Sequence, residues 1–167
     1  MFNFLKEPVT ESGITTKIGK IEDLEFRNRM CSAFSRSVAI EIKERACWQC
    51  EVTGKRYEDG WRLDASHKYT HDRNDPRYND PDNGICLCLE EHLKQHIELY
   101  WDSIEQGTEQ YIDWAYHSVR LIARRAYIDG LRSLDHYAEV PFDIVDDRDT
   151  VVEILSENGL DPKQLLI

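Results

Sequence analysis

The sequence predicts an α+β fold in which a short β-hairpin and the helix that follows it are embedded in a mainly helical domain. Two observations indicate the hairpin. The segments WRLDASH (61–67) and ICLC (85–88) have the composition of short strands, and a polar loop rich in Asp, Asn and Pro separates them. A third observation indicates the helices, because apolar residues recur at helical spacing on both sides of the hairpin.

The N-terminal part, residues 1–46, is expected to be an arm and a helix. Residues 1–20 have no clear hydrophobic period and contain Pro and Gly, which favours a loosely ordered arm. From residue 21 to residue 45 the apolar positions share one helical face, which predicts a single helix. These positions are Leu24, Met30, Phe34, Val38 and Ile42.

Three further parts follow along the chain. Residues 47–100 hold the hairpin and the start of its helix, EEHLKQHIELYWDSIEQ (90–106). A long amphipathic helix is predicted within 101–134, after Gly107. Residues 135–167 form a C-terminal region in which TVVEILSENG (150–159) predicts a short helix and DPKQLLI (161–167) a tail.

The charge is unevenly distributed. The 167 residues carry a net charge of -11, and nine of the 32 acidic residues but one of the 21 basic residues lie between Asp135 and Asp161. Affinity for nucleic acid rests mainly on Lys and Arg, so tight binding to bare duplex DNA is not expected. We expect the acidic C-terminal region to lie apart from any active site, where it is suited to a basic protein partner.

The sequence also indicates where in the cell the protein is expected. A mean hydropathy of -0.61 and the shortness of every apolar run argue against a membrane span. The N-terminus MFNFLKEPVTESG lacks a basic segment followed by an apolar one, so no secretory signal is expected. The five cysteines include a C-x-x-C and a C-x-C pattern, which indicates reduced thiolates on a metal and a cytoplasmic protein.

Four histidines and an asparagine gather around the predicted hairpin. His92 and His96 are four residues apart near the start of a helix, so they share a face and are able to reach one divalent ion. His67 ends the first strand, and Asn83 precedes the second. This set suits phosphodiester hydrolysis, in which an imidazole activates water and a metal stabilises the leaving oxygen. His71 lies in a charged loop and is interpreted as a solvated side chain.

Residues 47 to about 100 resemble the HNH endonuclease family, which has the ββα-metal fold. The resemblance rests on SH at 66–67, DNG at 82–84 and HLKQH at 92–96, in the family's order. It implies a DNA endonuclease in which His67 is the general base and Asn83 orients His67 by hydrogen bonding. It also implies that His92 and His96 hold the catalytic ion, which is Mg²⁺, Mn²⁺, Ni²⁺ or Zn²⁺.

One position departs from the family. Ser66 stands where relatives usually have an Asp or His that also binds the metal, so either Asp64 or a water molecule is expected to fill that place. The alternative function is a zinc-stabilised binding or regulatory protein that keeps the scaffold with weak or lost catalysis.

The resemblance also implies a structural zinc ion held by four thiolates, as in many relatives. Cys47 and Cys50 match the first ligand pair, and Cys88 matches the third ligand. Position 91, where the fourth ligand would lie, is Glu. Cys86 is therefore the expected fourth ligand, with Glu91 in reserve.

Overall fold

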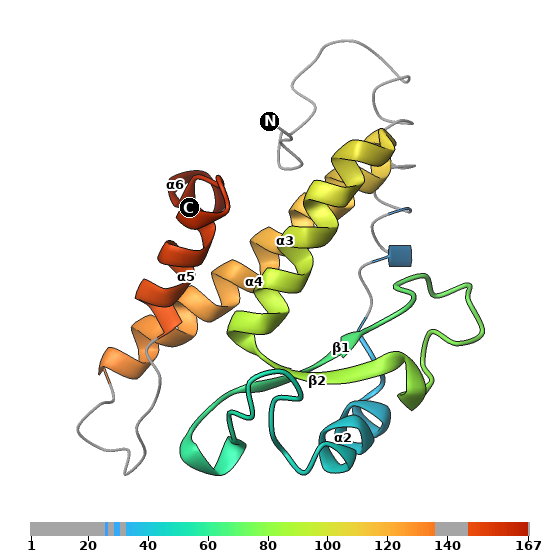
Figure 1. The fold of residues 1–167 in the computed structure, drawn as a ribbon, viewed down its shortest axis with the longest axis vertical. Coiled ribbons are helices and arrows are strands. Elements are labelled where there is room, and N and C mark those ends of the chain that lie inside the picture. Colours follow the sequence, from blue (N-terminus) through green and yellow to red (C-terminus); the bar gives the residue numbers. More distant parts are fainter. Residues whose placement is uncertain (1–25, 27–28, 31–32, 136–146, 167) are drawn as a thin grey trace.

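The computed structural model describes residue 26, residues 29–30, 33–135 and 147–166 (Figure 1). The predicted N-terminal arm and the beginning of the first helix lie outside these residues. A two-stranded antiparallel sheet is combined with helices that make up most of the described chain, so the α+β, mainly helical prediction is confirmed. Within the described residues no helix is long and apolar enough to cross a membrane.

The hairpin consists of β1, Leu63–His67, and β2, Gly84–Cys88. Leu63 pairs with Cys88 and His67 pairs with Gly84, which brings the end of β1 against the start of β2. A short 3-10 turn, η2 (Pro81–Asn83), leads into β2. Both strands were predicted, and the structure places His67 and the segment around residue 83 side by side.

Helix α2, Arg36–Arg45, lies on one side of the hairpin, below the strands in Figure 1. The prediction of one helix from residue 21 to residue 45 is wrong, because residues 33–35 are not helical. Two contacts explain the interruption. The Ser35 backbone N–H donates to Asn79 Oδ1 at 2.9 Å, and the Phe34 ring stacks on His67 at 3.7 Å between ring centres. The two contacts fix this segment to the end of β1 and to the loop that follows it.

A small core lies between α2 and the hairpin, and its centre is a close contact between Ile42 and Gly84. A Cβ atom on Gly84 would lie 2.1 Å from Ile42 Cδ1, so only glycine leaves room for this packing. The Arg45 guanidinium donates to the carbonyls of Pro81 and Gly84, at 3.0 and 2.8 Å. The buried members of this core are Phe34, Ile42, Cys50, Leu63, Cys86, Leu87 and Cys88.

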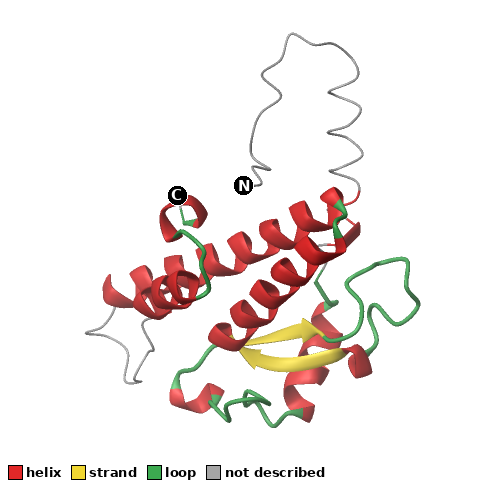
Figure 2. Cartoon of the chain, turned by 45° about the horizontal axis from the view of Figure 1, so that its top comes forward, coloured by secondary structure: helices red, strands yellow, loops and turns green. Residues whose placement is uncertain are grey.

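On the other side of the hairpin, α3 (Leu89–Gln106) packs along α4 (Glu109–Asp135). Figures 1 and 2 show these two long helices lying side by side above the strands. Gly107, with a φ of 72°, ends α3 in the left-handed conformation that glycine adopts without strain. Both helices were predicted, and α4 extends the framework well beyond the hairpin.

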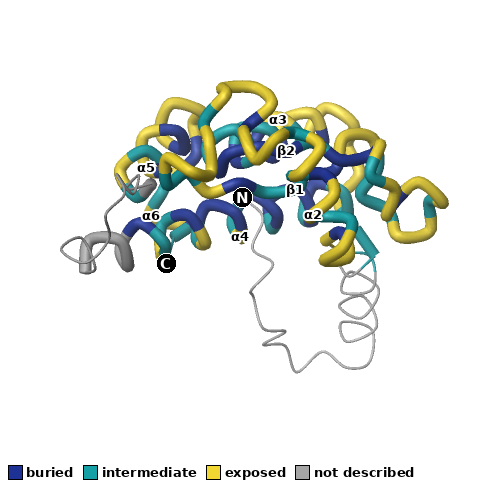
Figure 3. The backbone as a smooth tube through the Cα atoms, turned by 90° about the horizontal axis from the view of Figure 1, so that it is seen from below, coloured by how far each residue is buried: buried dark blue, intermediate teal, exposed yellow. Residues whose placement is uncertain are grey.

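The C-terminal helices belong to the main core. Helix α5, Asp147–Glu157, and helix α6, Pro162–Leu165, pack on α4, where the sequence predicted a short helix followed by a tail. Their apolar side chains are buried with those of α3 and α4, and the surface of α5 is exposed (Figure 3). The described part of the C-terminal region is therefore not a separate appendage, since the apolar residues of α5 recur at helical spacing and cover α4. The buried residues are Val151, Ile154, Leu155, Leu160 and Leu165.

Candidate active site

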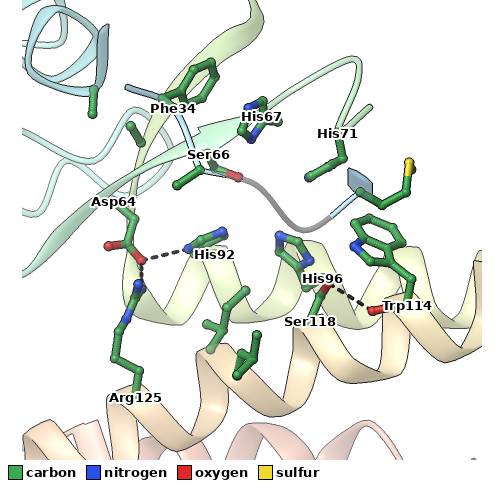
Figure 4. Close-up of a pocket in the computed structure, with 16 residues that line it drawn as sticks. Phe34, Asp64, Ser66, His67, His71, His92, His96, Trp114, Ser118 and Arg125 are labelled. Carbon is green, nitrogen blue, oxygen red and sulfur yellow. Dashed lines mark hydrogen bonds and ion pairs between the residues drawn. The ribbon is translucent and has the colours of Figure 1, made fainter. Parts of the chain in front are cut away.

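Four imidazoles line one pocket of about 500 Å³ between the hairpin and α3 and α4. His67 comes from the end of β1, His71 from the following loop, and His92 and His96 from the first turns of α3. The ring centres of His67 and His71 are 5.2 Å apart, those of His71 and His96 are 5.4 Å apart, and those of His92 and His96 are 4.9 Å apart. Figure 4 shows the four rings around a common space.

His67 is held by aromatic rings and has one nitrogen available. Its ring stacks on Phe34 at 3.7 Å and on Tyr78 at 4.7 Å, and 5% of the residue is exposed. Burial lowers the pKa of His67 to about 4, although a hydrogen bond with the backbone of Tyr78 opposes this effect. Nε2 has no hydrogen-bond partner within the described part of the chain, so Nδ1 makes that bond. His67 is thus neutral at pH 7, with the lone pair of Nε2 free to accept a proton.

Asn83 fixes the loop that follows β1. Its Oδ1 accepts hydrogen bonds from the backbone N–H groups of Tyr69 and Thr70, at 2.8 and 3.2 Å. Its Nδ2 donates to the carbonyls of Thr70 and Tyr78, at 3.0 and 3.3 Å. The backbone of Tyr78 also bonds the His67 ring, so Asn83 is linked to His67 through Tyr78. The side chain of Asn83 is buried, and all four of these bonds depend on it.

His92 is oriented by Asp64. The distance between His92 Nδ1 and Asp64 Oδ2 is 2.7 Å, and Arg125 from α4 donates to the same oxygen. Burial raises the pKa of Asp64, but the hydrogen bond from His92 and the positive charges nearby lower it overall, so the carboxylate is ionised. With Nδ1 engaged, His92 presents Nε2 as its free nitrogen, an arrangement that holds ligand histidines in many metal sites.

Ser66 is tied to α3. Its Oγ donates to Gln95 Oε1, and Gln95 Nε2 donates to the backbone carbonyl of His67 at 3.2 Å. Ser66 is almost fully buried, with 1% exposed. Asp64 or a water molecule was expected to supply the metal ligand that Ser66 does not. One oxygen of Asp64 is already bonded to both His92 and Arg125.

His96 is also buried in the pocket. It is 6% exposed, its ring centre is 6.3 Å from that of Trp114, and Nδ1 has no hydrogen-bond partner among the described residues. Burial lowers the pKa of His96 well below its ordinary value, and the neighbouring imidazoles add to this effect. His96 and His92 face the same pocket, as their spacing on α3 predicted.

The interpretation of His71 as a solvated side chain is wrong. Both hydrogen-bonding groups of the Thr70 backbone are held by Asn83, and His71 turns into the pocket. Its Nε2 is buried without a partner in the part of the chain that the structure describes. Burial, followed by the nearby imidazoles, lowers the pKa of His71 to about 3. The four-residue spacing from His67 to His71 was the available signal in the sequence.

Three of the four predicted zinc ligands lie in the small core under α2. Cys50, Cys86 and Cys88 are all buried there. Burial raises the pKa of the Cys50 thiol, but hydrogen bonds from Thr53 and nearby backbone N–H groups lower it overall. Burial raises the pKa of Cys86 and of Cys88 to about 11. Of these three thiols, Cys50 is therefore the one most readily converted to a thiolate.

Cys47 is placed differently. It is exposed and has a φ of 55°, and so does not share the burial of Cys50 three residues later. The reserve ligand Glu91 lies within 3.6 Å of Lys94 Nζ. Cys47 lines a separate surface hollow together with Trp48, Arg56, Tyr57 and Glu58.

No group of three or more His, Cys, Asp or Glu side chains in the described ranges is already arranged to hold a metal ion. The pocket nevertheless suits a cation, because His67, His71 and His96 each point a buried nitrogen into the site without a partner in the described chain. Comparisons with models of protein families, with curated proteins and with solved structures gave no match to this chain.

Proposed function

We propose that this protein is a metal-dependent endonuclease of the HNH type that hydrolyses phosphodiester bonds in DNA. The observation that carries the proposal is the meeting of His67, His92 and His96 around one pocket at a hairpin and helix, with Asn83 holding the loop beside it. These residues come from three separate elements, and their order and spacing in the sequence resemble the HNH pattern.

In this proposal His67 is the general base. Its neutral Nε2 takes a proton from the water that attacks the phosphorus, while Phe34 and Tyr78 keep the ring in place. Asn83 is a positioning residue, since it holds the Tyr78 carbonyl. A pKa of about 4 makes His67 a weak base, so the attacking water must itself be made more acidic.

His92 and His96 would hold a divalent cation, Mg²⁺ or another ion. Such an ion supplies positive charge that acidifies water and stabilises the leaving oxygen. The fit rests on His92 Nε2, which the bond from Nδ1 to Asp64 leaves free, and on the buried, unpartnered Nδ1 of His96.

We also propose a structural zinc ion at Cys47, Cys50, Cys86 and Cys88, in a reducing compartment such as the cytoplasm. Burial of three thiols in one core supports three of these ligands. Cys47 has to turn inward to complete the set, and Glu91 is the reserve. Zinc content per chain should be about one, and Cys50→Ser should abolish it. Zinc retained by Cys47→Ser would leave Glu91 as the fourth ligand.

The test of the nuclease is plasmid cleavage with a panel of divalent metals. His67→Ala should lower the turnover rate by roughly 10²–10⁴-fold, the usual contribution of a positioned base. Lys68→Ala, an exposed neighbour, is the matched control and should cleave like the wild type. No cleavage by the wild type with any metal, or full cleavage by His67→Ala, would refute the catalytic proposal.

A second candidate function is binding to a basic protein without catalysis. The observation that favours it is an exposed acidic face on α5, where Asp149, Glu153 and Glu157 recur every four residues. Replacing these three residues with their amides should weaken binding of a lysine-rich peptide. Unchanged peptide affinity in that variant would remove this candidate.

A further inference from the structure

The residues of β1 that line the pocket offer few free ligands to the divalent ion of the proposed function. Ser66 donates its hydroxyl proton to Gln95, and the Oδ2 atom of Asp64 is shared by His92 and Arg125. Two histidines from one helix supply only two ligands, although zinc sites usually use at least three protein ligands. A further ligand is therefore to be sought among the other residues that line the pocket.

His71 has the geometry of that ligand. Two imidazoles bound to one ion at about 2.1 Å have ring centres roughly 4.7 to 5.3 Å apart, for octahedral and tetrahedral angles respectively. The observed distances are 4.9 Å from His92 to His96 and 5.4 Å from His96 to His71. His96 is thus flanked on both sides by an imidazole at ligand spacing.

The structure holds His71 inward at an energetic cost. The Thr70 backbone is bonded to Asn83, and the His71 ring lies 5.1 Å from the centre of Trp114. Leaving a buried polar nitrogen without a partner destabilises the folded state. His71 Nε2 and His96 Nδ1 both lack a partner among the described residues, and both lie in one pocket. A single cation that accepts a lone pair from each nitrogen is the simplest explanation.

We propose that His71, His92 and His96 form a three-imidazole set for one divalent ion, with His67 left free as the base. This inference rests on the metal site of the proposed function. Three neutral nitrogen ligands without a carboxylate suit Zn²⁺, Ni²⁺ or Co²⁺ better than Mg²⁺, which prefers oxygen.

The experiment is calorimetric titration with Ni²⁺ of the full chain loaded with one equivalent of Zn²⁺, the amount that the proposed cysteine site takes up. His71→Ala should raise the Kd for Ni²⁺ by at least roughly 10- to 100-fold, the loss that even an outer-shell partner of a ligand causes. His92→Ala and His96→Ala should do the same, and His67→Ala should not. His117→Gln, a histidine of α4 that does not line the pocket, is the control for unspecific binding. His71→Gln keeps a side chain of similar length if the alanine variant folds poorly.

The possible results distinguish a failure of the three-histidine site from a failure of the proposed nuclease function. Wild-type Ni²⁺ affinity in both His71 variants, with weakening in His92→Ala, would refute the third ligand and leave a two-histidine site. Weakening in His67→Ala but not in the His71 variants would exchange the two roles and also refute the inference. Three-histidine dependence of Ni²⁺ binding without any plasmid cleavage would support the inference and refute the nuclease.

Discussion

Replacing Gly84 with Ala tests how α2 is seated on the hairpin. The added methyl group would lie 2.1 Å from Ile42 Cδ1 and 2.6 Å from Ile42 Cγ1, where carbon atoms normally stay about 3.5–4.0 Å apart. Ile42 is completely buried, so its side chain has no open space to enter. Overpacking of this kind costs about 1–3 kcal/mol, more than the roughly 0.8 kcal/mol that burying one extra methyl group contributes.

A double-mutant cycle with Ile42→Ala makes this reasoning quantitative. Ile42→Ala removes both clashing atoms and should cost about 2–5 kcal/mol on its own. In that background Gly84→Ala fills part of the cavity, so its own cost should fall to near zero. Urea unfolding followed by circular dichroism gives the four free energies of unfolding. An equal cost of Gly84→Ala in both backgrounds would show that the two side chains do not meet.

Three further predictions follow from the pocket and the core. Asp64→Asn should weaken divalent-metal binding by roughly 10- to 100-fold in calorimetry, because His92 loses its carboxylate partner; unchanged affinity would refute this role. The pKa of His67 is about 4 in the fold against 6.5 ordinarily, so the unfolded chain binds more protons between these values. His67 alone should therefore account for a fall of about 2 kcal/mol in the free energy of unfolding of metal-free protein from pH 6.5 to about pH 5, and His67→Gln should remove this part of the slope in urea titrations. Deleting residues 147–167 should expose the core and unfold the chain in a thermal melt, whereas Glu153→Gln should leave the melting temperature unchanged.

Local patterns were sufficient to predict most elements. Both strands and the helices after them have short-range signals, namely alternation, helical spacing and a terminal glycine such as Gly107. The break in the first predicted helix has no such signal. It depends on Phe34 reaching His67 and on Ser35 reaching Asn79, contacts between residues more than 30 positions apart. Tertiary contacts of this kind override helical propensity.

The site was predictable where it follows a linear motif. The residues His67, Asn83 and His92 were assigned from their order and spacing, and the structure brings them to one pocket or to the loop beside it. His71 and Arg125 were not assigned to the site. Their places depend on how the loop folds back and on how α4 crosses the hairpin, which no short window of sequence records.

The pairing of Asp64 with Arg125 has a consequence for the order in which the site is assembled. These two are the charged side chains among the described residues that line the pocket, apart from the imidazoles, and their charges cancel. His67 and His71 stay neutral at pH 7, because burial holds their pKa values at about 4 and about 3. A divalent cation would therefore add positive charge to the pocket, in a chain whose net charge of -11 repels phosphates. In the proposed nuclease, a nucleic-acid strand would be attracted to the pocket only after the ion has bound, so ion binding would precede substrate binding.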